Sequence, residues 1–563
     1  MTVRGFLEAI VNRSAWKSSG LAAWKEPVGN IRVSAAVLLV CVGLGVAPAA
    51  AATCEDLASL KLPDTTITLA QSVAAGAFTP PPDPFGFPPA VPFKNVPAFC
   101  RVAGVIRPTS DSNIQFEVWM PSAGWNGKLQ GIGNGGFAGT IPYSALSLPI
   151  ARGYAIATTD TGHVGGDASW ALGHPEKLVD FGYRAIHETA VKAKAILHAF
   201  YGEGPQRSYF SSCSNGGRQA LMEAQRYPAD YDGIIAGAPA NFWTHLLSAA
   251  AWNVQALSDP ASYIPASKFK AIEAAALAAC DARDGVVDGV IDEPTKCGFD
   301  PSVLLCKGPE SDSCLTEPQV AALKKIYAGP RNSQGEQVFP GYLPGSETGP
   351  GGWGLWITGA KPGGSLLSFF ATQYFRNIVF ENASWDLQTF NLDKDVKLAD
   401  EKTARILNAT DPNLTAFQSR GGKLILYHGW NDAGIPAQNT INYYQSVVAR
   451  MGQRDAGQFV RLFLVPGMQH CGDGVGPNSF GQAGVSIQAD AGHDISLALE
   501  RWVEKGTAPD TIIAAKHGAD PDPTKGILRT RPLCAYPQVA RWKGAGSTDD
   551  AANFVCVTPD SGK

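Results

Sequence analysis

Ser214 stands in a stretch whose residue order can produce an activated nucleophile. The residues before it, 208–212, are aromatic or small and favour a strand, while Gly216 and Gly217 permit a sharp bend. A helix-forming run, 218–225, follows. A serine at the apex between a strand and a helix has its hydroxyl exposed at the end of a sheet, so we interpret this stretch as a nucleophile elbow.

The helix expected after Ser214 favours negative charge close to the serine. A helix N-terminus presents free N–H groups and the positive end of the helix dipole. The N–H of Asn215 is therefore our first candidate donor to an oxyanion. The match to Gly-x-Ser-x-Gly is incomplete, because Ser212 replaces the first glycine. For this stretch alone, an ordinary Ser-x-Gly-Gly turn is the alternative.

Two further residues complete a candidate Ser-His-Asp triad. Asp432 follows a predicted strand at 423–428, and His470 follows another at 459–465. The chain order Ser, Asp, His, with each residue after a core strand, is typical of an α/β-hydrolase. The histidine would move the serine proton, and the aspartate would hold the imidazole tautomer. Taken singly, Asp432 would more often cap a helix and His470 would more often be a surface residue.

A glycine-rich loop supplies a second candidate oxyanion donor. The predicted strand 128–132 runs into Gly133-Asn134-Gly135-Gly136. In hydrolases of this kind an N–H from the loop after an early strand completes the oxyanion hole. We expect that N–H to come from Gly135 or Gly136. A plain glycine turn is the alternative.

The composition excludes some classes of function. The chain has 563 residues, of which 45% are hydrophobic and 17% charged, and its net charge is −4. This hydrophobic content suffices for a large buried core. The charge balance gives no signature of polyanion binding, so nucleic acid is not an expected partner.

The N-terminal segment, residues 1–52, reads as an export signal. Basic residues precede an apolar run at 33–46, and small residues follow at 47–52. A run of this length is typical of a signal peptide and short for a membrane span. We therefore expect a secreted or periplasmic protein with no membrane contact in its mature form. A start downstream of Met1 and an uncleaved anchor remain alternatives.

The cysteine count bears on disulfide bonding. Cys41 lies inside the apolar run, and ten cysteines remain after its removal: Cys54, Cys100, Cys213, Cys280, Cys297, Cys306, Cys314, Cys471, Cys534 and Cys556. An even number in an exported chain predicts disulfides. Spacing favours the local pairs Cys280–Cys297, Cys306–Cys314 and Cys534–Cys556. The others must pair over longer distances.

The order of predicted elements defines the domains. Strands alternate with helices over 54–240, which predicts a parallel sheet, and the alternation resumes within 409–563. The intervening segment, 241–408, is rich in Trp, Gly, Pro and Cys and shows no such alternation. We therefore expect an α/β-hydrolase fold whose core is split by a large lid domain.

The cysteines beside the candidate triad point to a family. Cys213-Ser214, the distant Asp432 and His470-Cys471 resemble the Cys-Ser…Asp…His-Cys pattern of the tannase and feruloyl esterase family. The resemblance covers nearly all of the mature chain and includes 159–163, 223–228, 237–240, 374–376 and 532–540. It implies a Cys213–Cys471 disulfide that ties the two catalytic loops together. The departure from the family pattern is Ser212, where glycine is more usual, and we expect the elbow to tolerate it.

An acidic loop in the lid is a candidate calcium site. Residues 280–292 combine carboxylates with turn glycines, which suits the oxygen ligands of Ca²⁺, although the spacing is not that of an EF-hand. A solvated acidic turn is the alternative. The family resemblance implies a structural calcium, with these ligands: the side chains of Asp281, Asp284 and Asp288, and the carbonyls of Val286 and Val290. Cys280–Cys297 would brace the loop.

These observations lead to one functional hypothesis and several rivals. We expect a serine esterase that forms an acyl-enzyme, and the resemblance implies aromatic esters of the hydroxycinnamoyl or galloyl type, from plant cell walls or tannins. The lid aromatics Trp353, Trp356, Phe369, Phe370 and Trp385 are candidate walls of an acyl pocket, although most are expected in the core.

Arg376 is a weaker candidate for substrate contact, with a structural ion pair as its alternative. The rival functions are hydrolysis of mono(2-hydroxyethyl) terephthalate, which the same family includes, peptidase activity, and non-catalytic binding of phenolics or carbohydrates on a hydrolase fold.

Overall fold

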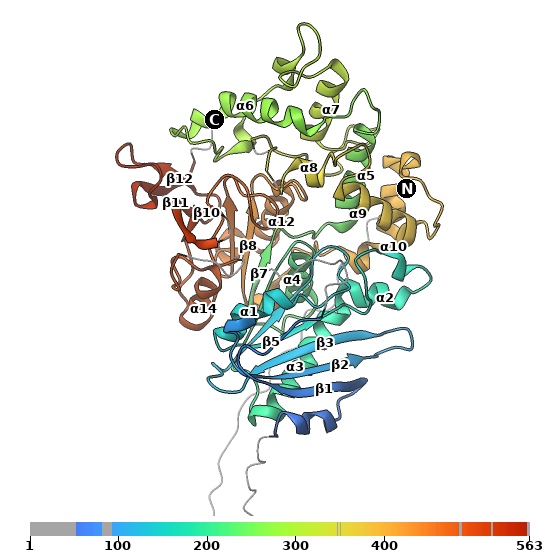
Figure 1. Cartoon of the computed structure of the whole chain (residues 1–563), viewed down its shortest axis with the longest axis vertical. Coiled ribbons are helices and arrows are strands. Elements are labelled where there is room, and N and C mark those ends of the chain that lie inside the picture. The colour runs from blue at the N-terminus through green and yellow to red at the C-terminus, as the bar shows by residue number, and fades with distance from the viewer. Residues whose placement is uncertain are drawn as a thin grey trace, which may run out of the picture. The chain divides into compact units, whose positions relative to one another are not determined.

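A nine-stranded mixed sheet forms the centre of the computed structural model, which describes residues 52–81, 93–345, 347–349, 351–482, 487–519 and 522–559 (Figure 1). The strand order is β1-β2-β3-β5-β4-β6-β7-β8-β9. The strands are β1 (Thr65–Val73), β2 (Phe99–Ile106), β3 (Ile114–Pro121), β4 (Lys128–Ile132), β5 (Ala155–Thr159), β6 (Arg207–Cys213), β7 (Gly233–Gly237), β8 (Lys423–Gly429) and β9 (Val460–Val465).

The direction of the strands places the candidate site residues at one edge. From β5 through β4, β6, β7 and β8 to β9 every neighbouring pair is parallel. Parallel strands end at the same edge of a sheet, so the loops after β4, β6, β8 and β9 meet there. The prediction of a parallel sheet is therefore confirmed for six strands. It did not foresee β1 and β2, which extend the sheet antiparallel beyond β3.

Side chains that alternate along the strands pack against helices on both faces of the sheet. Tyr209, Ile235 and Ile425 pack with α1 (Tyr143–Ala151) and α14 (Ile495–Lys505). Their neighbours Phe210, Ile234 and Leu424 pack with α4 (Asn215–Arg226) and α12 (Ala437–Met451). This alternation is the period-two pattern of a strand, and it buries the core strands on both faces. The helix α3 (Ala185–Tyr201) covers β3 to β5.

In its described residues the segment 241–408 consists mainly of helices joined by long loops, and it supplies most of one hydrophobic core. Its helices are α5 (Trp243–Ala256), α6 (Phe269–Cys280), α7 (Glu317–Ala328), α8 (Trp353–Trp356), α9 (Leu366–Tyr374) and α10 (Leu392–Leu407). It enters the chain between β7 and β8, where the sequence predicts an insertion. The fold is thus the α/β-hydrolase fold with an inserted lid.

The remaining elements lie outside the sheet. Three short helices are α2 (Pro175–Val179), α11 (Thr415–Ser419) and α13 (Gln453–Ala456). The chain ends in two antiparallel hairpins that the sequence analysis did not foresee: β10 (Thr511–Ala519) with β11 (Asp522–Cys534), and β12 (Val539–Trp542) with β13 (Phe554–Val557).

Five disulfides connect the ten cysteines of residues 54–556. The three local pairs that spacing favours are present. Cys213 is bonded to Cys471, and Cys54 to Cys100. Except for residue 52, the predicted export signal lies outside the described residues. Within the described residues, no helix is both long and apolar enough to cross a membrane.

Candidate active site

Ser214 occupies a strained turn between β6 and α4. Its φ is +66° and its ψ is −126°, a combination that residues other than glycine rarely adopt. The turn is tight because the chain crowds itself here. A Cβ at Gly216 would lie 1.9 Å from Oγ of Ser212, and a Cβ at Gly217 would lie 2.3 Å from the carbonyl oxygen of Gly237. Two glycines therefore make the elbow possible, and one of them also makes room for the unusual Ser212.

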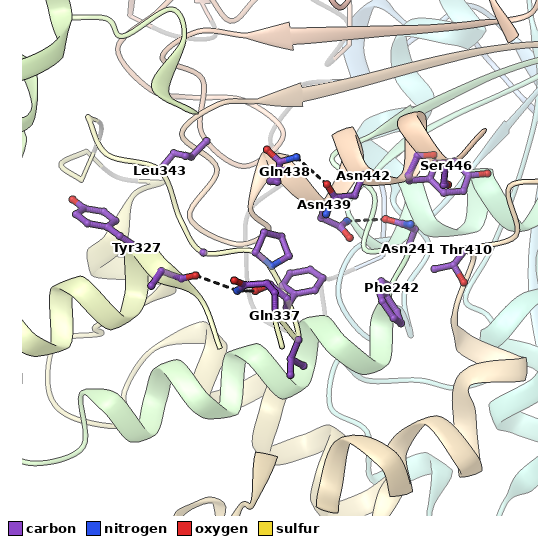
Figure 2. Close-up of a pocket in the computed structure, with 16 residues that line it drawn as sticks. Asn241, Phe242, Tyr327, Gln337, Leu343, Thr410, Gln438, Asn439, Asn442 and Ser446 are labelled. Carbon is purple, nitrogen blue, oxygen red and sulfur yellow. Dashed lines mark hydrogen bonds between the residues drawn. The ribbon is translucent and has the colours of Figure 1, made fainter. Parts of the chain in front are cut away.

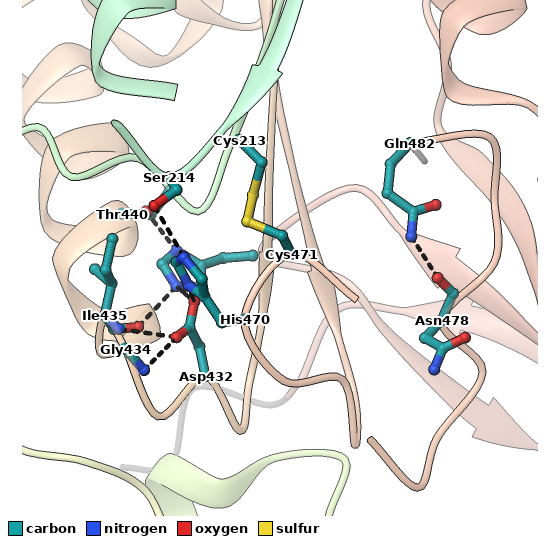
Figure 3. The surroundings of a disulfide bond; sticks show 11 residues. Cys213, Ser214, Asp432, Gly434, Ile435, Thr440, His470, Cys471, Asn478 and Gln482 are labelled. Atoms are coloured by element: carbon teal, nitrogen blue, oxygen red, sulfur yellow. Dashed lines mark hydrogen bonds and ion pairs between the residues drawn. A yellow bond between two sulfur atoms is a disulfide. The ribbon is translucent and has the colours of Figure 1, made fainter. Parts of the chain in front are cut away.

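The three candidate triad residues are linked by hydrogen bonds (Figure 3). Nε2 of His470 lies 2.9 Å from Oγ of Ser214, and Nδ1 of His470 lies 2.8 Å from Oδ2 of Asp432. Both distances are normal for hydrogen bonds. The structure thus brings together residues that are up to 256 positions apart in the chain.

Two features hold the histidine loop against the other loops. The disulfide between Cys213 and Cys471 joins the residue before Ser214 to the residue after His470 (Figure 3). At the end of β8, a Cβ at Gly429 would lie 2.3 Å from the carbonyl oxygen of Met468, so only glycine allows this approach. The Ser–His distance is therefore restrained by a covalent bond as well as by packing.

Asp432 is equipped to stay ionised although its side chain is fully buried. Oδ1 accepts hydrogen bonds from the N–H groups of Gly434 at 2.7 Å and Ile435 at 2.8 Å. Burial alone would raise the pKa of Asp432, but the charge of His470 and hydrogen bonds from His428 and His470 outweigh it and hold that pKa well below its usual range. An ionised carboxylate can fix the tautomer of His470.

The glycine-rich loop after β4 is clamped beside the elbow. Oε1 of Gln219, on α4, accepts a hydrogen bond from the N–H of Asn134 at 2.9 Å. The amide of Asn134 donates to the carbonyl oxygens of Thr140 and Thr159. Of the two predicted glycines, Gly136 lines the cavity that contains Ser214, whereas Gly135 is not among the residues lining it.

Asn215, the other candidate donor, is the first residue of α4, where helix geometry leaves N–H groups without an intrahelical acceptor. Its side chain is held by Arg218, whose Nε donates to Oδ1 of Asn215 at 2.8 Å. The Arg218 guanidinium is completely buried and lies over the rings of Phe181 and Trp243, and burial lowers its pKa to about 9. It therefore remains protonated at neutral pH and fixes the first turn of α4.

An apolar cavity opens beside Ser214 and His470. Its volume is about 60 Å³. Apart from the residues near the triad, its walls are aromatic and aliphatic side chains: Trp243, Leu246, Leu247, Trp356, Leu367, Phe370 and Ile435. No Lys, Arg, Asp or Glu is among the described residues that line it.

Only part of this wall was foreseen. Trp356 and Phe370 line the cavity as proposed, and Trp356 also packs edge-on against His470. Trp353 and Trp385 lie in the lid core, and Phe369 is exposed. The contribution of α5 was missed, because helical spacing alone does not tell which face of a lid helix covers the sheet edge.

Comparisons with known proteins agree with this geometry. The profile of the family described as tannase and feruloyl esterase matches residues 100–557. An uncharacterized esterase of Xanthomonas campestris pv. campestris is 46% identical over 563 residues, covering 95% of this chain and 96% of that protein. A probable feruloyl esterase B-2 of Aspergillus flavus is 34% identical over 446 residues, with 78% and 83% covered.

A solved structure extends the match to three dimensions. The crystal structure of feruloyl esterase B from Aspergillus oryzae superposes with a TM-score of 0.82 at 30% identity, covering 90% of this chain and 99% of that one. The chain belongs to the tannase and feruloyl esterase family. It is a carboxylic ester hydrolase of that type.

In this member of the tannase and feruloyl esterase family, Arg376 does not reach the nucleophile. Its Nε and Nη2 donate to the carbonyl oxygen of Trp385 at 3.2 and 3.0 Å. It is not among the residues that line the cavity at Ser214. The structure therefore places Arg376 in the architecture of the lid.

The acidic loop of the lid gathers negative charge. Burial, with the charges of neighbouring aspartates, raises the pKa of Asp284 to about 6 and that of Asp292 to about 7. Oxygen donors of this kind are those that Ca²⁺ prefers. The carboxylate of Asp281 accepts hydrogen bonds from two backbone N–H groups of the loop. Asp288 forms salt bridges with Arg529 and Arg531. Within the described residues, no three His, Cys, Asp or Glu side chains are arranged to hold a metal.

Figure 2 shows a larger cavity, lined by other residues. It measures about 640 Å³ and is lined by residues of α12 and of the lid, among them Phe242, Gln337, Asn439 and Asn442. Ser214, Asp432 and His470 are absent from the described residues that line it. Size alone is therefore a poor guide to the chemistry of this protein.

Proposed function

We propose that this chain is an exported serine esterase that hydrolyses esters of neutral aromatic acids, of the hydroxycinnamoyl type, through Ser214, His470 and Asp432. The observation that carries this proposal is the continuous hydrogen-bond chain from Oγ of Ser214 through His470 to Asp432, at a strained elbow beside an apolar cavity.

The first half of the reaction forms an acyl-enzyme. Nε2 of His470 takes the Ser214 proton as Oγ attacks the ester carbonyl, and Asp432 stabilises the imidazolium. The N–H groups of Asn215 and Gly136 donate to the oxyanion. His470 then returns the proton to the leaving alcohol, and the acyl group stays on Ser214.

The second half releases the acid. A water molecule loses its proton to Nε2 of His470 and attacks the acyl carbonyl. The same N–H groups stabilise the second oxyanion, and the proton passes to Oγ of Ser214 as the acid departs. The enzyme returns to its starting protonation state.

The walls of the cavity favour a neutral acyl group. A buried carboxylate needs a cation or several hydrogen-bond donors beside it. The described residues that line the cavity include no Lys and no Arg that could supply the cation. This argues against mono(2-hydroxyethyl) terephthalate, whose acyl part carries a carboxylate. It also argues against galloyl groups, because three phenolic hydroxyls would lose hydrogen bonds against leucine and phenylalanine side chains.

The cavity must open further to admit an aromatic ring. Ligand pockets usually measure roughly 300–1,000 Å³, whereas this one measures about 60 Å³. Its lid side chains Trp356 and Phe370 stack at 6.1 Å and come from short helices, α8 and α9. We propose that these two rings move aside when substrate binds.

Initial rates on a panel of esters test the proposal. The panel is methyl ferulate, methyl p-coumarate, methyl gallate, mono(2-hydroxyethyl) terephthalate and p-nitrophenyl acetate, with Ser214→Ala alongside. We expect the two hydroxycinnamates to give the highest kcat/KM, with at least a roughly thousandfold loss in the variant. A preference for terephthalate or gallate would refute the acyl assignment. Turnover that survives in the variant would refute the role of Ser214, and no turnover at all would favour a binding protein.

We further propose that the acidic loop binds Ca²⁺ as a structural ion. The ligands would be the side chains of Asp281, Asp284 and Asp288 and the carbonyls of Val286 and Val290. The support is the set of hard oxygen donors, together with the burial and the neighbouring charges that raise two carboxyl pKa values. The Arg531–Asp288 pair would have to loosen for Asp288 to bind the ion.

Export is proposed from two observations. The apolar run near the N-terminus has the length of a signal peptide, and the five disulfides require an oxidising compartment. Sequencing of the mature N-terminus from a culture supernatant or periplasmic extract tests it.

A further inference from the structure

Asp432 contacts two imidazoles. Its Oδ2 atom lies 2.8 Å from Nδ1 of His470 and 3.1 Å from Nε2 of His428. Its Oδ1 atom is occupied by the N–H groups of Gly434 and Ile435 (Figure 3). His428 lies on β8, four residues before Asp432, and its side chain is completely buried. No step of the mechanism above uses it.

The partners of His428 determine which nitrogen carries the proton. Nε2 faces two atoms that can only accept: Oδ2 of Asp432 and the carbonyl oxygen of Ile435 at 2.9 Å. Nε2 is therefore protonated. Nδ1 lies 2.7 Å from Oγ1 of Thr440. That hydroxyl has no other hydrogen-bond partner in the described structure, so it donates to Nδ1, and His428 is uncharged.

The surrounding charges support a neutral His428. The buried cluster contains one carboxylate, and it gains one positive charge when His470 takes the Ser214 proton. A second imidazolium would leave an unbalanced buried cation. Two phenols, those of Tyr342 and Tyr427, also sense the charge of Asp432, and burial raises the pKa of both. They are uncharged in the working range.

We propose that His428 is a positioning residue that aims Oδ2 of Asp432 at His470. The Nε2–H group holds Oδ2 and the carbonyl oxygen of Ile435 together, while Thr440 on α12 holds the ring. The loop that carries Asp432 is thereby fixed between β8 and α12. The hydrogen bond also withdraws charge from Oδ2, which limits how strongly Asp432 holds the protonated form of His470. This inference rests on the proposed roles of Ser214, Asp432 and His470.

Two amide variants of the same site test the proposal. In His428→Gln the amide nitrogen can occupy the place of Nε2 and still donate to Asp432. In His428→Asn the shorter side chain reaches only the place of Nδ1, so the contact with Thr440 survives and the donor is lost. The readouts are kcat, KM and the acid limb of the kcat/KM profile, on whichever ester the wild type hydrolyses best in a Ser214-dependent manner.

We expect His428→Gln to keep kcat within about threefold and the acid limb within about 0.3 pH unit. His428→Asn should lower kcat by about ten- to a hundredfold with KM nearly unchanged, the cost of one hydrogen bond to a charged group. Its acid limb should move to higher pH, because the freed carboxylate holds the protonated His470 more tightly. Equal losses in both variants, with unshifted acid limbs, would reduce His428 to a packing residue and overturn the proposal.

Thr440→Val covers the case in which His428→Asn fails to fold. It preserves side-chain shape and touches only the Nδ1 side, so the acid limb should stay in place, and a shift would show that His428 works through its other nitrogen.

The downfield proton resonance of the His470–Asp432 hydrogen bond, followed against pH, gives a readout independent of turnover. Failure of Ser214 dependence in the wild type would instead remove the proposed function itself.

Discussion

Oγ of Ser212 lies 1.9 Å from the position that a Cβ at Gly216 would occupy, and Cβ of Ser212 lies 2.5 Å from it. The serine that replaces the usual first glycine of the elbow is thus accommodated by the glycine that remains. The expectation that the elbow tolerates Ser212 agrees with the geometry at Ser214. The two positions are coupled, because a side chain fits at only one of them.

This coupling predicts a non-additive pair of substitutions. Gly216→Ala should lower kcat/KM by at least about a hundredfold, because the turn must shift and displace Ser214. Adding Ser212→Gly should restore most of that loss, since the nearest remaining atom is the Asn134 carbonyl oxygen at 3.3 Å. A double-mutant cycle on kcat/KM measures the coupling. Full activity of Gly216→Ala alone would contradict the crowding argument.

The disulfide between Cys213 and Cys471 predicts a combined loss of stability and rate. It closes a loop of 258 residues, which chain-entropy arguments value at about 5 kcal/mol. The variant Cys213→Ser/Cys471→Ser should unfold at lower denaturant concentration. Its kcat should also fall, because the elbow and the histidine loop lose their covalent link.

The matched control is Cys306→Ser/Cys314→Ser. That pair closes a loop of only eight residues at the lid and touches none of the triad residues. It should leave kcat unchanged. If both double variants keep the wild-type kcat, the central disulfide serves stability alone.

The sequence predicts the candidate site better than it predicts the surrounding fold. Asp432 and His470 each follow a buried strand with a strong apolar pattern, and Ser214 follows a strand of aromatic and small residues, so their meeting at one sheet edge can be deduced. β1 has no such signal, because as an edge strand it is half exposed and rich in Thr, Gln and Ser. His428 escapes notice for another reason: at the end of an apolar strand it reads as a terminal residue, and only its contacts reveal a role.

The lid marks the limit of sequence reasoning. Phe369 and Phe370 are neighbours of the same type, yet one is exposed and the other lines the cavity at Ser214. Which of them faces the nucleophile depends on how α9 sits on α5 and the sheet edge, and that packing is set by distant parts of the chain. The same dependence makes the pair a useful experimental contrast.

Phe370→Ala should enlarge the acyl cavity. The Phe370 ring lies 3.2 Å from the position of a Cβ at Gly136, directly over the candidate oxyanion loop. Removing it should raise the ratio of kcat/KM for methyl ferulate over p-nitrophenyl acetate by about tenfold, since hydrophobic pockets discriminate by size to this extent. Phe369→Ala is the control and should leave the ratio unchanged. A lower ratio in Phe370→Ala would show that the ring binds the acyl group instead of obstructing it.

Calcium should stabilise the lid and change its response to pH. EDTA removes calcium from the protein. In the calcium-free folded protein the pKa of Asp284 is about 6 and that of Asp292 about 7, both higher than in the unfolded chain. Carboxyl groups whose pKa is raised by folding stabilise the folded protein at low pH. That stabilisation is lost as the pH rises through their folded-state pKa values. The Tm of the calcium-free protein should therefore fall by about 5 °C between pH 5 and pH 8.

With Ca²⁺ bound, the carboxylates are ionised and paired, so this fall should shrink or reverse. At a free calcium concentration one hundred times Kd, the ion should add about 2.7 kcal/mol to the free energy of unfolding. Asp284→Asn should abolish the calcium effect on Tm. Asp312→Asn, which alters an exposed lid carboxylate bonded to Ser267, should preserve it. If calcium does not change the Tm of the wild-type protein at pH 8, the proposal that this loop binds Ca²⁺ is wrong.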